Sequence, residues 1–147
     1  MPEINALVYR GYPVQDLAEN CRFEEVAFLL WNEDLPTKSQ LAEFEEKERA
    51  YREISNDLKD VIKKFPKNAH PMDTLRTGVS FLGMEDERIW DNSVEVNRDK
   101  ALMLLAKIPT IIAADYRARN GKEIIDPKAD LTTVSYTHLT LPTIYSV

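Results

Sequence analysis

The sequence is poor in the residues that most often form tight turns, disulfides and metal sites. Its 147 residues include only 4 Gly, 2 His and 1 Cys. So few glycines disfavour all-β folds, whose many tight turns need backbone with positive φ. The single cysteine, Cys21, cannot form an internal disulfide, which suits a reducing compartment, and we expect the cytoplasm. Cys21 lies beside Arg22, so it is either a reactive thiol or, as we favour, a small, partly buried side chain.

Long apolar runs and excess positive charge are also missing. No stretch reaches the roughly 18–20 apolar residues of a membrane span. Residues 101–114 come nearest and are interrupted by Lys107, Pro109 and Thr110. Residues 1–20 lack the basic start and apolar run of a signal peptide. The net charge of −6 argues against nucleic acid, because phosphate binding needs a basic surface. We therefore predict neither a membrane nor a nucleic acid as partner.

Charge is absent from one end of the chain. The 19 basic and 25 acidic residues all lie within residues 1–130, and residues 131–147 carry none. Over the whole chain the composition is ordinary for a globular protein, with 44% hydrophobic and 30% charged residues. The composition therefore changes near residue 131.

Helical spacing of apolar residues dominates the sequence. Residues 7–12 are aromatic and β-branched and indicate a short strand that ends at Gly11. Later apolar residues recur at intervals of three and four, which predicts helices. The six predicted helical segments are 13–19, 23–31, 37–54, 56–65, 71–83 and 97–119. We predict an all-α fold with at most a short strand near residues 7–12.

Local signals suggest where these helices begin and end. The predicted caps are Thr37 with Gln40, Asn56 or Asp57, Gly83 and Asn97. Pro109 lies inside the last helix and should kink it, because proline lacks the N–H that the helix needs.

Few residues are candidates for chemistry. The sequence has no glycine-rich phosphate loop, no Gly-x-Ser-x-Gly elbow and no Cys/His cluster at metal-ligand spacing. His70 is the one acid–base candidate, because His138 lies in the uncharged end. His70 precedes Pro71 at a helix start, so capping or core packing is favoured over catalysis.

Charged residues near the apolar segments also have structural interpretations. Asp73 falls in a first helical turn, where the helix dipole favours a carboxylate. Arg76 could hold a carboxylate or phosphate, but a salt bridge to an acidic neighbour is favoured. Lys107 either extends to solvent or pairs with Asp115. The residues alone do not reveal a function.

Four segments nevertheless resemble the citrate synthase family, in the same order along the chain. They are Leu7-Val8-Tyr9-Arg10-Gly11-Tyr12-Pro13-Val14-Gln15-Asp16-Leu17-Ala18, then Phe23-Glu24-Glu25-Val26-Ala27-Phe28-Leu29-Leu30 with Leu35-Pro36-Thr37, then His70-Pro71-Met72-Asp73-Thr74-Leu75-Arg76-Thr77-Gly78-Val79-Ser80, and finally Leu105-Ala106-Lys107-Ile108-Pro109-Thr110-Ile111. Within the family the likeness is greatest to bacterial 2-methylcitrate synthases, some of which also make citrate.

The resemblance implies a mostly helical large domain, a smaller helical domain and a homodimer. It implies that the helices near 72–83 and 101–119 pack across the dimer twofold axis. It also implies condensation of acetyl-CoA or propionyl-CoA with oxaloacetate, and so a role in the tricarboxylic acid cycle or propionate catabolism. The acyl-CoA is a substrate, and the family uses no metal or redox cofactor.

The sequence also departs from the family. The family's catalytic His and Asp residues and its substrate-binding Arg residues belong to later motifs that this sequence does not contain. We therefore assign no catalytic, cofactor-binding or metal-binding residue. We predict that residues 1–131 are the N-terminal part of the large domain and are inactive alone. The alternative is a non-catalytic helical interaction module.

Residues 132–147 break with the family pattern. Within them, residues 134–143 resemble translated sequencing-adaptor or vector read-through, so we predict that 132–147 are a tail outside the family. A C-terminal β-strand is the alternative, favoured by their Thr, Tyr, Val and Ile content.

Overall fold

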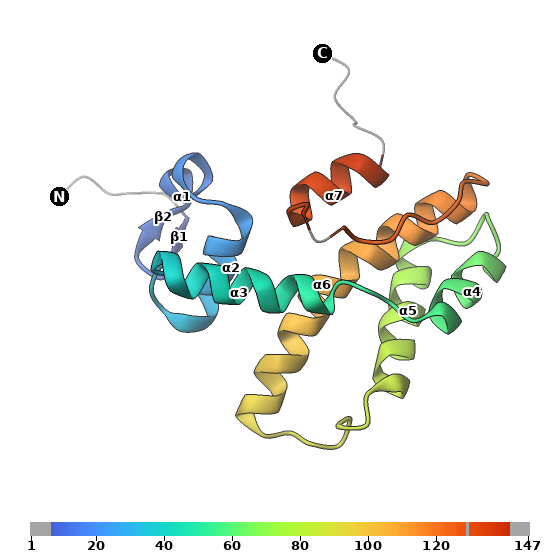
Figure 1. Cartoon of the computed structure of the whole chain (residues 1–147), viewed down its shortest axis with the longest axis horizontal. Coiled ribbons are helices and arrows are strands. Elements are labelled where there is room, and N and C mark those ends of the chain that lie inside the picture. The colour runs from blue at the N-terminus through green and yellow to red at the C-terminus, as the bar shows by residue number, and fades with distance from the viewer. Residues whose placement is uncertain (1–6, 129, 142–147) are drawn as a thin grey trace, which may run out of the picture. The chain divides into compact units, whose positions relative to one another are not determined.

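The computed structural model describes residues 7–128 and 130–141, and this part of the chain is almost entirely helical (Figure 1). The only sheet in it pairs β1 (Val8–Tyr9) with β2 (Tyr12–Pro13). The helices are α1 (Val14–Asn20), α2 (Phe23–Asn32), α3 (Lys38–Tyr51), α4 (Asn56–Lys64), α5 (Pro71–Glu85), α6 (Val94–Arg119) and α7 (Thr133–Thr140). The all-α prediction, with its short strand near residues 7–12, is confirmed.

The chain divides into two compact units within α3, residues 1–47 and residues 48–147. In the first unit, β1 and β2 form an antiparallel hairpin that pairs Val8 with Pro13 and Tyr9 with Tyr12. Its two turn residues, Arg10 and Gly11, have φ of 50° and 92°. A two-residue turn with positive φ at both positions matches the natural twist of paired strands.

Aromatic side chains hold α2 against the first part of α3 within this unit. The ring of Phe44 meets the rings of Phe28 and Trp31 edge-on, with centroids 5.7 and 6.0 Å apart. Thr37 and Gln40 form the predicted capping box at the start of α3. The Thr37 N–H donates to Gln40 Oε1 at 2.9 Å, and the Gln40 N–H donates to Thr37 Oγ1 at 3.3 Å.

The second unit is built around α6, which packs against α4, α5 and α7. Its buried core consists of Ile54, Leu58, Ile62, Leu82, Ile111 and Ala114. These residues come from α4, α5, α6 and the segment before α4. The helix α6 continues through Pro109, as predicted. Because several neighbours surround α6, its apolar residues are buried on more than one side.

Three predicted helix ends are wrong by a few residues. Ser55, rather than Asn56 or Asp57, caps α4, and its hydroxyl accepts the Leu58 N–H at 3.1 Å. The helix α5 continues through Gly83 to Glu85, because Gly83 keeps a helical rather than a left-handed backbone. Asn97 lies inside α6, where its N–H donates to the carbonyl of Ser93, the residue before the helix.

Two further differences concern α3 and the end of the chain. The helix α3 ends at Tyr51, so Ile54 lies beyond it and reaches the core from an irregular segment. Residues 133–140 form α7, so the alternative of a C-terminal strand is wrong there. Thr132 caps α7 by accepting the Ser135 N–H at 3.1 Å, a pattern typical of a helix start. Residues 142–147 of the proposed tail lie outside the described residues.

Candidate functional site

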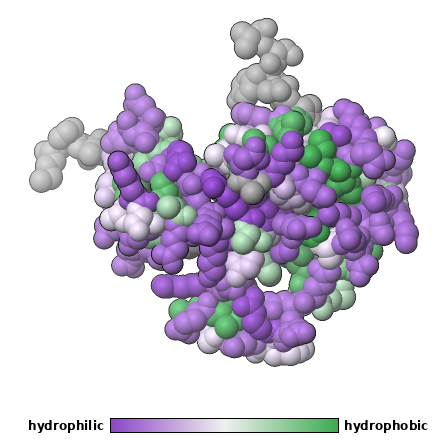
Figure 2. All heavy atoms as spheres, viewed as in Figure 1, coloured by the Kyte–Doolittle hydropathy of each residue, from purple (hydrophilic) through white to green (hydrophobic). Residues whose placement is uncertain are grey.

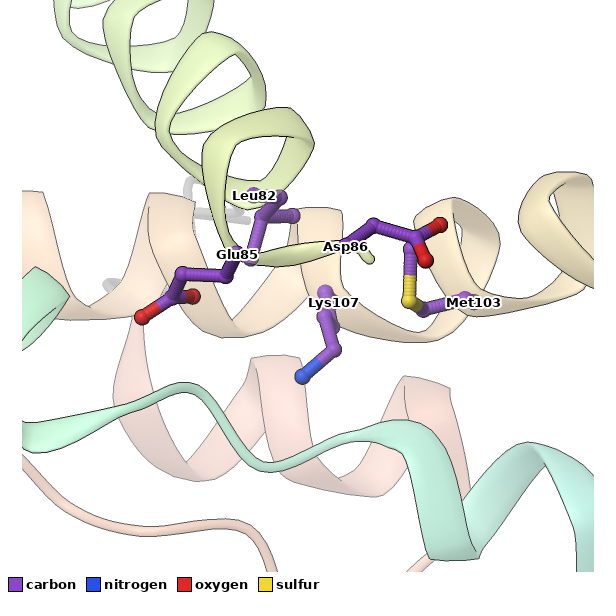
Figure 3. A pocket seen from close by; sticks show the side chains of 5 residues that line it. All are labelled: Leu82, Glu85, Asp86, Met103 and Lys107. Carbon is purple, nitrogen blue, oxygen red and sulfur yellow. The ribbon is translucent and has the colours of Figure 1, made fainter. Parts of the chain in front are cut away.

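A pocket lined by charged and apolar side chains lies between the end of α5 and the middle of α6 (Figure 3). Its volume is about 190 Å³. The lining residues are Leu82, Glu85, Asp86, Met103 and Lys107. Figure 3 shows Lys107 and Met103 on one helix, with Leu82 and Glu85 on the other. The pocket therefore combines one amine, two carboxylates and two apolar side chains.

Lys107 is fixed by the backbone that follows α3. Its ammonium donates to the carbonyl oxygen of Glu53. One helical turn further along α6, the buried Thr110 hydroxyl donates to the carbonyl oxygen of Arg52 at 2.8 Å. Both carbonyls follow the last helical residue of α3, where no helical N–H remains to bind them. Two polar side chains from the mostly apolar middle of α6 (residues 101–114) thus satisfy the backbone of the α3–α4 connection.

The surroundings of Lys107 change its proton affinity. Burial lowers the pKa of Lys107, and the nearby Glu85 and Glu53 carboxylates oppose that shift. The predicted pairing with Asp115 is wrong, since Asp115 binds Arg119 at 2.7 Å instead. Asp115 and Arg119 are four residues apart on α6, so their side chains meet on one face of the helix. Lys107 remains partly exposed, and its ammonium donates to the Glu53 carbonyl at the surface.

A hydrogen-bond network orders the connection between α5 and α6, which borders the pocket. The pKa of Asp86 is lowered, mainly because its carboxylate accepts a hydrogen bond from the backbone N–H of Arg88. The Arg88 guanidinium lowers it further. Arg88 also donates to Asp99 of α6 at 2.8 Å, and hydrogen bonds to Asp99 and Asp86 raise the pKa of Arg88. The ammonium of Lys100 donates to the carbonyl of Asp91 at 2.8 Å. These bonds tie the connection to α6.

A buried ion pair lies near the start of the second unit. The guanidinium of Arg52 donates from Nε to both Glu48 carboxylate oxygens at 2.9 Å, and from Nη2 to Glu48 Oε2 at 2.6 Å. Both side chains are less than 5% exposed. Arg52 also donates to the Leu131 carbonyl at 2.5 Å and to Thr133 Oγ1 at 3.2 Å. The pair therefore joins the end of α3 to the start of α7.

The sequence candidates at the start of α5 have structural roles. His70 Nδ1 accepts the Met72 N–H at 3.2 Å, so the predicted capping role is confirmed. Asp73 lies in the first turn of α5 and binds Arg76 at 2.9 Å, which confirms the predicted salt bridge. The same ring nitrogen of His70 that caps the helix is not free to act as a base.

Cys21 and His138 carry no sign of catalysis. Burial, and secondarily the carboxylate of Glu25, raise the pKa of the Cys21 thiol. Both effects favour the protonated thiol over the reactive thiolate, which supports the structural interpretation. His138 lies in the last turn of α7. No group of three His, Cys, Asp or Glu within residues 7–128 and 130–141 is arranged to hold a metal ion.

Sequence reasoning missed the importance of Tyr136. Its side chain is buried, and its hydroxyl donates to the carbonyl of Ile125 at 2.8 Å. Burial raises the pKa of Tyr136 to about 12, with a further contribution from Asp126. Tyr136 and Thr140, the two buried residues of α7, are four apart. That helical spacing was the available signal for a helix with one buried side.

Solved structures of other proteins share this architecture. The all-α fold matches solved citrate synthases, first that of Thermotoga maritima, with a TM-score of 0.79 and 38% identity. That match covers 92% of this chain and 34% of the Thermotoga chain. The citrate synthase of Pyrobaculum aerophilum matches with a TM-score of 0.82 and 31% identity, over 90% of this chain and 35% of its own.

The sequence gives the same result. The family profile described as "Citrate synthase, C-terminal domain" matches residues 2–142, so the chain belongs to the citrate synthase family. Over 127 residues it is 50% identical to 2-methylcitrate synthase 2 of Corynebacterium glutamicum. That alignment covers 86% of this chain and 33% of the relative. It is also 49% identical over 131 residues to a citrate synthase of Mycolicibacterium smegmatis, covering 89% and 35% respectively. The chain thus spans about a third of the length of the curated relatives it matches.

Proposed function

We propose that this chain forms about a third of an enzyme that condenses an acyl-CoA with oxaloacetate. The product is a tricarboxylate, and hydrolysis of the thioester releases CoA. One observation carries the proposal. The citrate synthase profile covers residues 2–142, and the relatives that share about half of the aligned residues are named 2-methylcitrate synthase or citrate synthase.

The catalytic groups of this reaction belong to the part of the enzyme outside this chain. Such a condensation needs a base to remove the α-proton of the acyl-CoA, and positioned donors to stabilise the enolate. In the described residues, His70 caps α5 and Lys107 binds a backbone carbonyl. His70 can act as a base only by giving up that bond, because its Nδ1 lone pair accepts the Met72 N–H. The 147-residue chain alone is therefore inactive in this proposal.

The chain contributes to a homodimer through α5 and α6. Apolar side chains remain exposed on both helices, notably Met72 at 60% and Ile112 at 39%. Such residues are suited to burial against a second copy. On the face drawn in Figure 2, apolar residues (green) form patches on a mostly hydrophilic surface. The described residues include no helix long and apolar enough to cross a membrane. The assembly acts in the cytoplasm, and with propionyl-CoA it serves propionate catabolism.

A chimaera tests the proposal directly. Residues 1–131 replace the aligned segment of the Corynebacterium 2-methylcitrate synthase 2, and a thiol reagent follows CoA release. The donors are propionyl-CoA and acetyl-CoA, each with oxaloacetate. We expect release by the chimaera and none by the 147-residue chain. A folded chimaera of the parent's oligomeric state that releases no CoA contradicts the proposal. Turnover by the 147-residue chain contradicts its predicted inactivity.

Comparison of the two donors also decides the substrate. The two acyl groups differ by one methylene, which changes binding by only about 1–3 kcal/mol. If the chimaera and its parent enzyme prefer different acyl-CoA donors, residues 1–131 contribute to substrate specificity. If both prefer the same donor, the specificity lies in the rest of the enzyme.

The proposed boundary at residue 131 needs its own test. Resequencing the DNA beyond codon 131 shows whether residues 132–147 are native. A continuing frame that encodes the family's later His and Asp motifs supports read-through at this end. Confirmation of the codons for residues 132–147 contradicts it.

A non-catalytic interaction module is the second candidate. It is favoured by the strongly exposed Trp90, 89% exposed, and Met84, 76% exposed, near the connection between α5 and α6. Large apolar side chains in such positions often mark binding surfaces. A module must fold alone, so a soluble chain with a cooperative thermal melt supports this candidate. A molten or aggregating chain supports the enzyme fragment.

A further inference from the structure

The amine of Lys107, like that of Lys100, donates to backbone carbonyl oxygen, whereas Lys59 and Lys63 bind carboxylates. Lys59 pairs with Asp126 at 2.6 Å, and Lys63 pairs with Asp60 at 3.1 Å. Lys107 forms no ion pair within the described part of the chain and has one bond, to the carbonyl oxygen of Glu53. A carbonyl accepts a hydrogen bond from a neutral amine as well as from an ammonium. The local geometry therefore does not require a charge on Lys107.

The pocket beside Lys107 has the size and lining for a short acyl chain. One water needs about 10–15 Å³ of such space, and the pocket offers about 190 Å³. Leu82 and Met103 provide apolar contacts, and Glu85 and Asp86 provide polar ones (Figure 3). A chain of a few carbons can lie against the apolar side chains while its reactive carbonyl faces the amine.

Burial, rather than the neighbouring charges, favours the neutral and nucleophilic form of Lys107. Burial lowers the pKa of Lys107, and the groups that oppose the shift are Glu85 of α5 and Glu53 of the α3–α4 connection. Asp86 also lines the pocket, but it is engaged by Arg88. Each unit by which a lysine pKa falls raises its neutral fraction at pH 7.5 about tenfold. Only the neutral amine has a lone pair for attack on a carbonyl carbon.

We propose that Lys107 is the preferred site of acylation on this chain, with short-chain acyl thioesters as donors. The amine nitrogen attacks the thioester carbonyl, a C–N bond forms and the C–S bond breaks. The thiolate leaves and takes up the proton that the nitrogen loses, so the products are an amide and a free thiol. The resulting amide keeps one N–H, which can still donate to the Glu53 carbonyl. The choice of donor rests on the proposed function; the nucleophile rests on the pocket.

The test uses the intact 147-residue chain and the propionyl thioester of N-acetylcysteamine, a small uncharged donor. Peptide mass spectrometry follows the initial rate of propionylation at each lysine at pH 7.5. We expect Lys107 to react roughly threefold or more faster than the exposed, ion-paired Lys63, because of its larger neutral fraction. Equal or slower reaction at Lys107 overturns the proposal. No oxaloacetate is present and no turnover is needed, so this result is independent of the condensation proposal.

Two variants separate the pocket's effect from simple access. In Glu85→Gln the carboxylate that opposes the lowered pKa is gone, so Lys107 should react about twofold faster or more, while Lys63 stays unchanged. Lys107→Arg removes the modified peptide and identifies the signal. A folded E85Q chain with an unchanged or lower rate at Lys107 overturns the proposal. If E85Q does not fold, the pH profile of the unaltered chain decides: a rate midpoint at Lys107 at or above about 10.4, the ordinary lysine value, overturns it.

Discussion

Replacing Glu48 with leucine should strongly destabilise the second unit. Glu48 is the carboxylate partner of Arg52, and both side chains are less than 5% exposed. In Glu48→Leu the guanidinium keeps its bonds to the Leu131 carbonyl and Thr133 Oγ1 but loses its counter-charge. A buried charge left without its partner is far less stable than the same charge in water.

The expected loss follows from this burial. Breaking a buried pair by removing one partner costs about 3–5 kcal/mol. Whole domains are stable by only about 5–15 kcal/mol, so the variant should lose a large part of its stability. The exposed Arg76–Asp73 pair is the matched control, with side chains 80% and 57% exposed. Removing it with Arg76→Ala should cost only about 0–1 kcal/mol.

Urea denaturation followed by circular dichroism measures both variants. The double variant Glu48→Leu/Arg52→Leu removes both charges and should be more stable than Glu48→Leu alone, since no unpaired charge remains. Because the pair contacts the start of α7, protease cleavage near residues 128–133 should also increase in Glu48→Leu. If Glu48→Leu and Arg76→Ala lose the same free energy of unfolding, the assignment of a strong buried pair is refuted.

Two further predictions concern the core of the second unit. In Tyr136→Phe we expect a loss of about 1 kcal/mol at neutral pH, from the bond to the Ile125 carbonyl. The folded pKa of Tyr136, about 12, lies above the ordinary value of about 10, so its stabilisation is complete below about pH 10 and declines as the pH rises toward 12. Urea midpoints from neutral to high pH should therefore fall less in Tyr136→Phe than in the unaltered chain, and parallel curves would contradict this. Gly78→Ala should lower the melting temperature, because its Cβ would lie 3.0 Å from Cγ2 of the buried Ile111. Gly83→Ala should raise the melting temperature, because alanine favours the helix by up to about 1 kcal/mol of unfolding free energy. Its Cβ would meet only the end of the partly exposed Ile89 side chain, at 3.2 Å. Equal effects of the two substitutions would contradict the packing argument.

Much of the secondary structure could be predicted from local patterns. The strand near residues 7–12 and six helices follow from aromatic, β-branched and helically spaced apolar residues, and all are present. The Thr37–Gln40 box, the His70 cap and the Asp73–Arg76 bond also follow from spacing. Each joins residues within four positions of one another, so no distant part of the chain is needed to form it.

The incorrect helix ends have local competitors. Ser55, Asn56 and Asp57 are all good caps in succession, and the backbone selects the first. Gly83 permits a left-handed end but does not require one, and the helix continues over it to Glu85. Sequence patterns rank such alternatives poorly, because their energies differ by only about 1 kcal/mol.

Local patterns in the sequence are enough to assign the helical class, and four family segments in order reveal the kinship with citrate synthases. Which distant groups meet is shown only by the folded structure. It placed Lys107 and Thr110 of α6 on the carbonyls of Glu53 and Arg52, more than 50 residues away in the chain. It also placed the start of α7 on the buried Glu48–Arg52 pair. The physical reason is that a helix pattern records which side is apolar, whereas the partner of a polar side chain depends on which backbone groups the packed core leaves without hydrogen bonds.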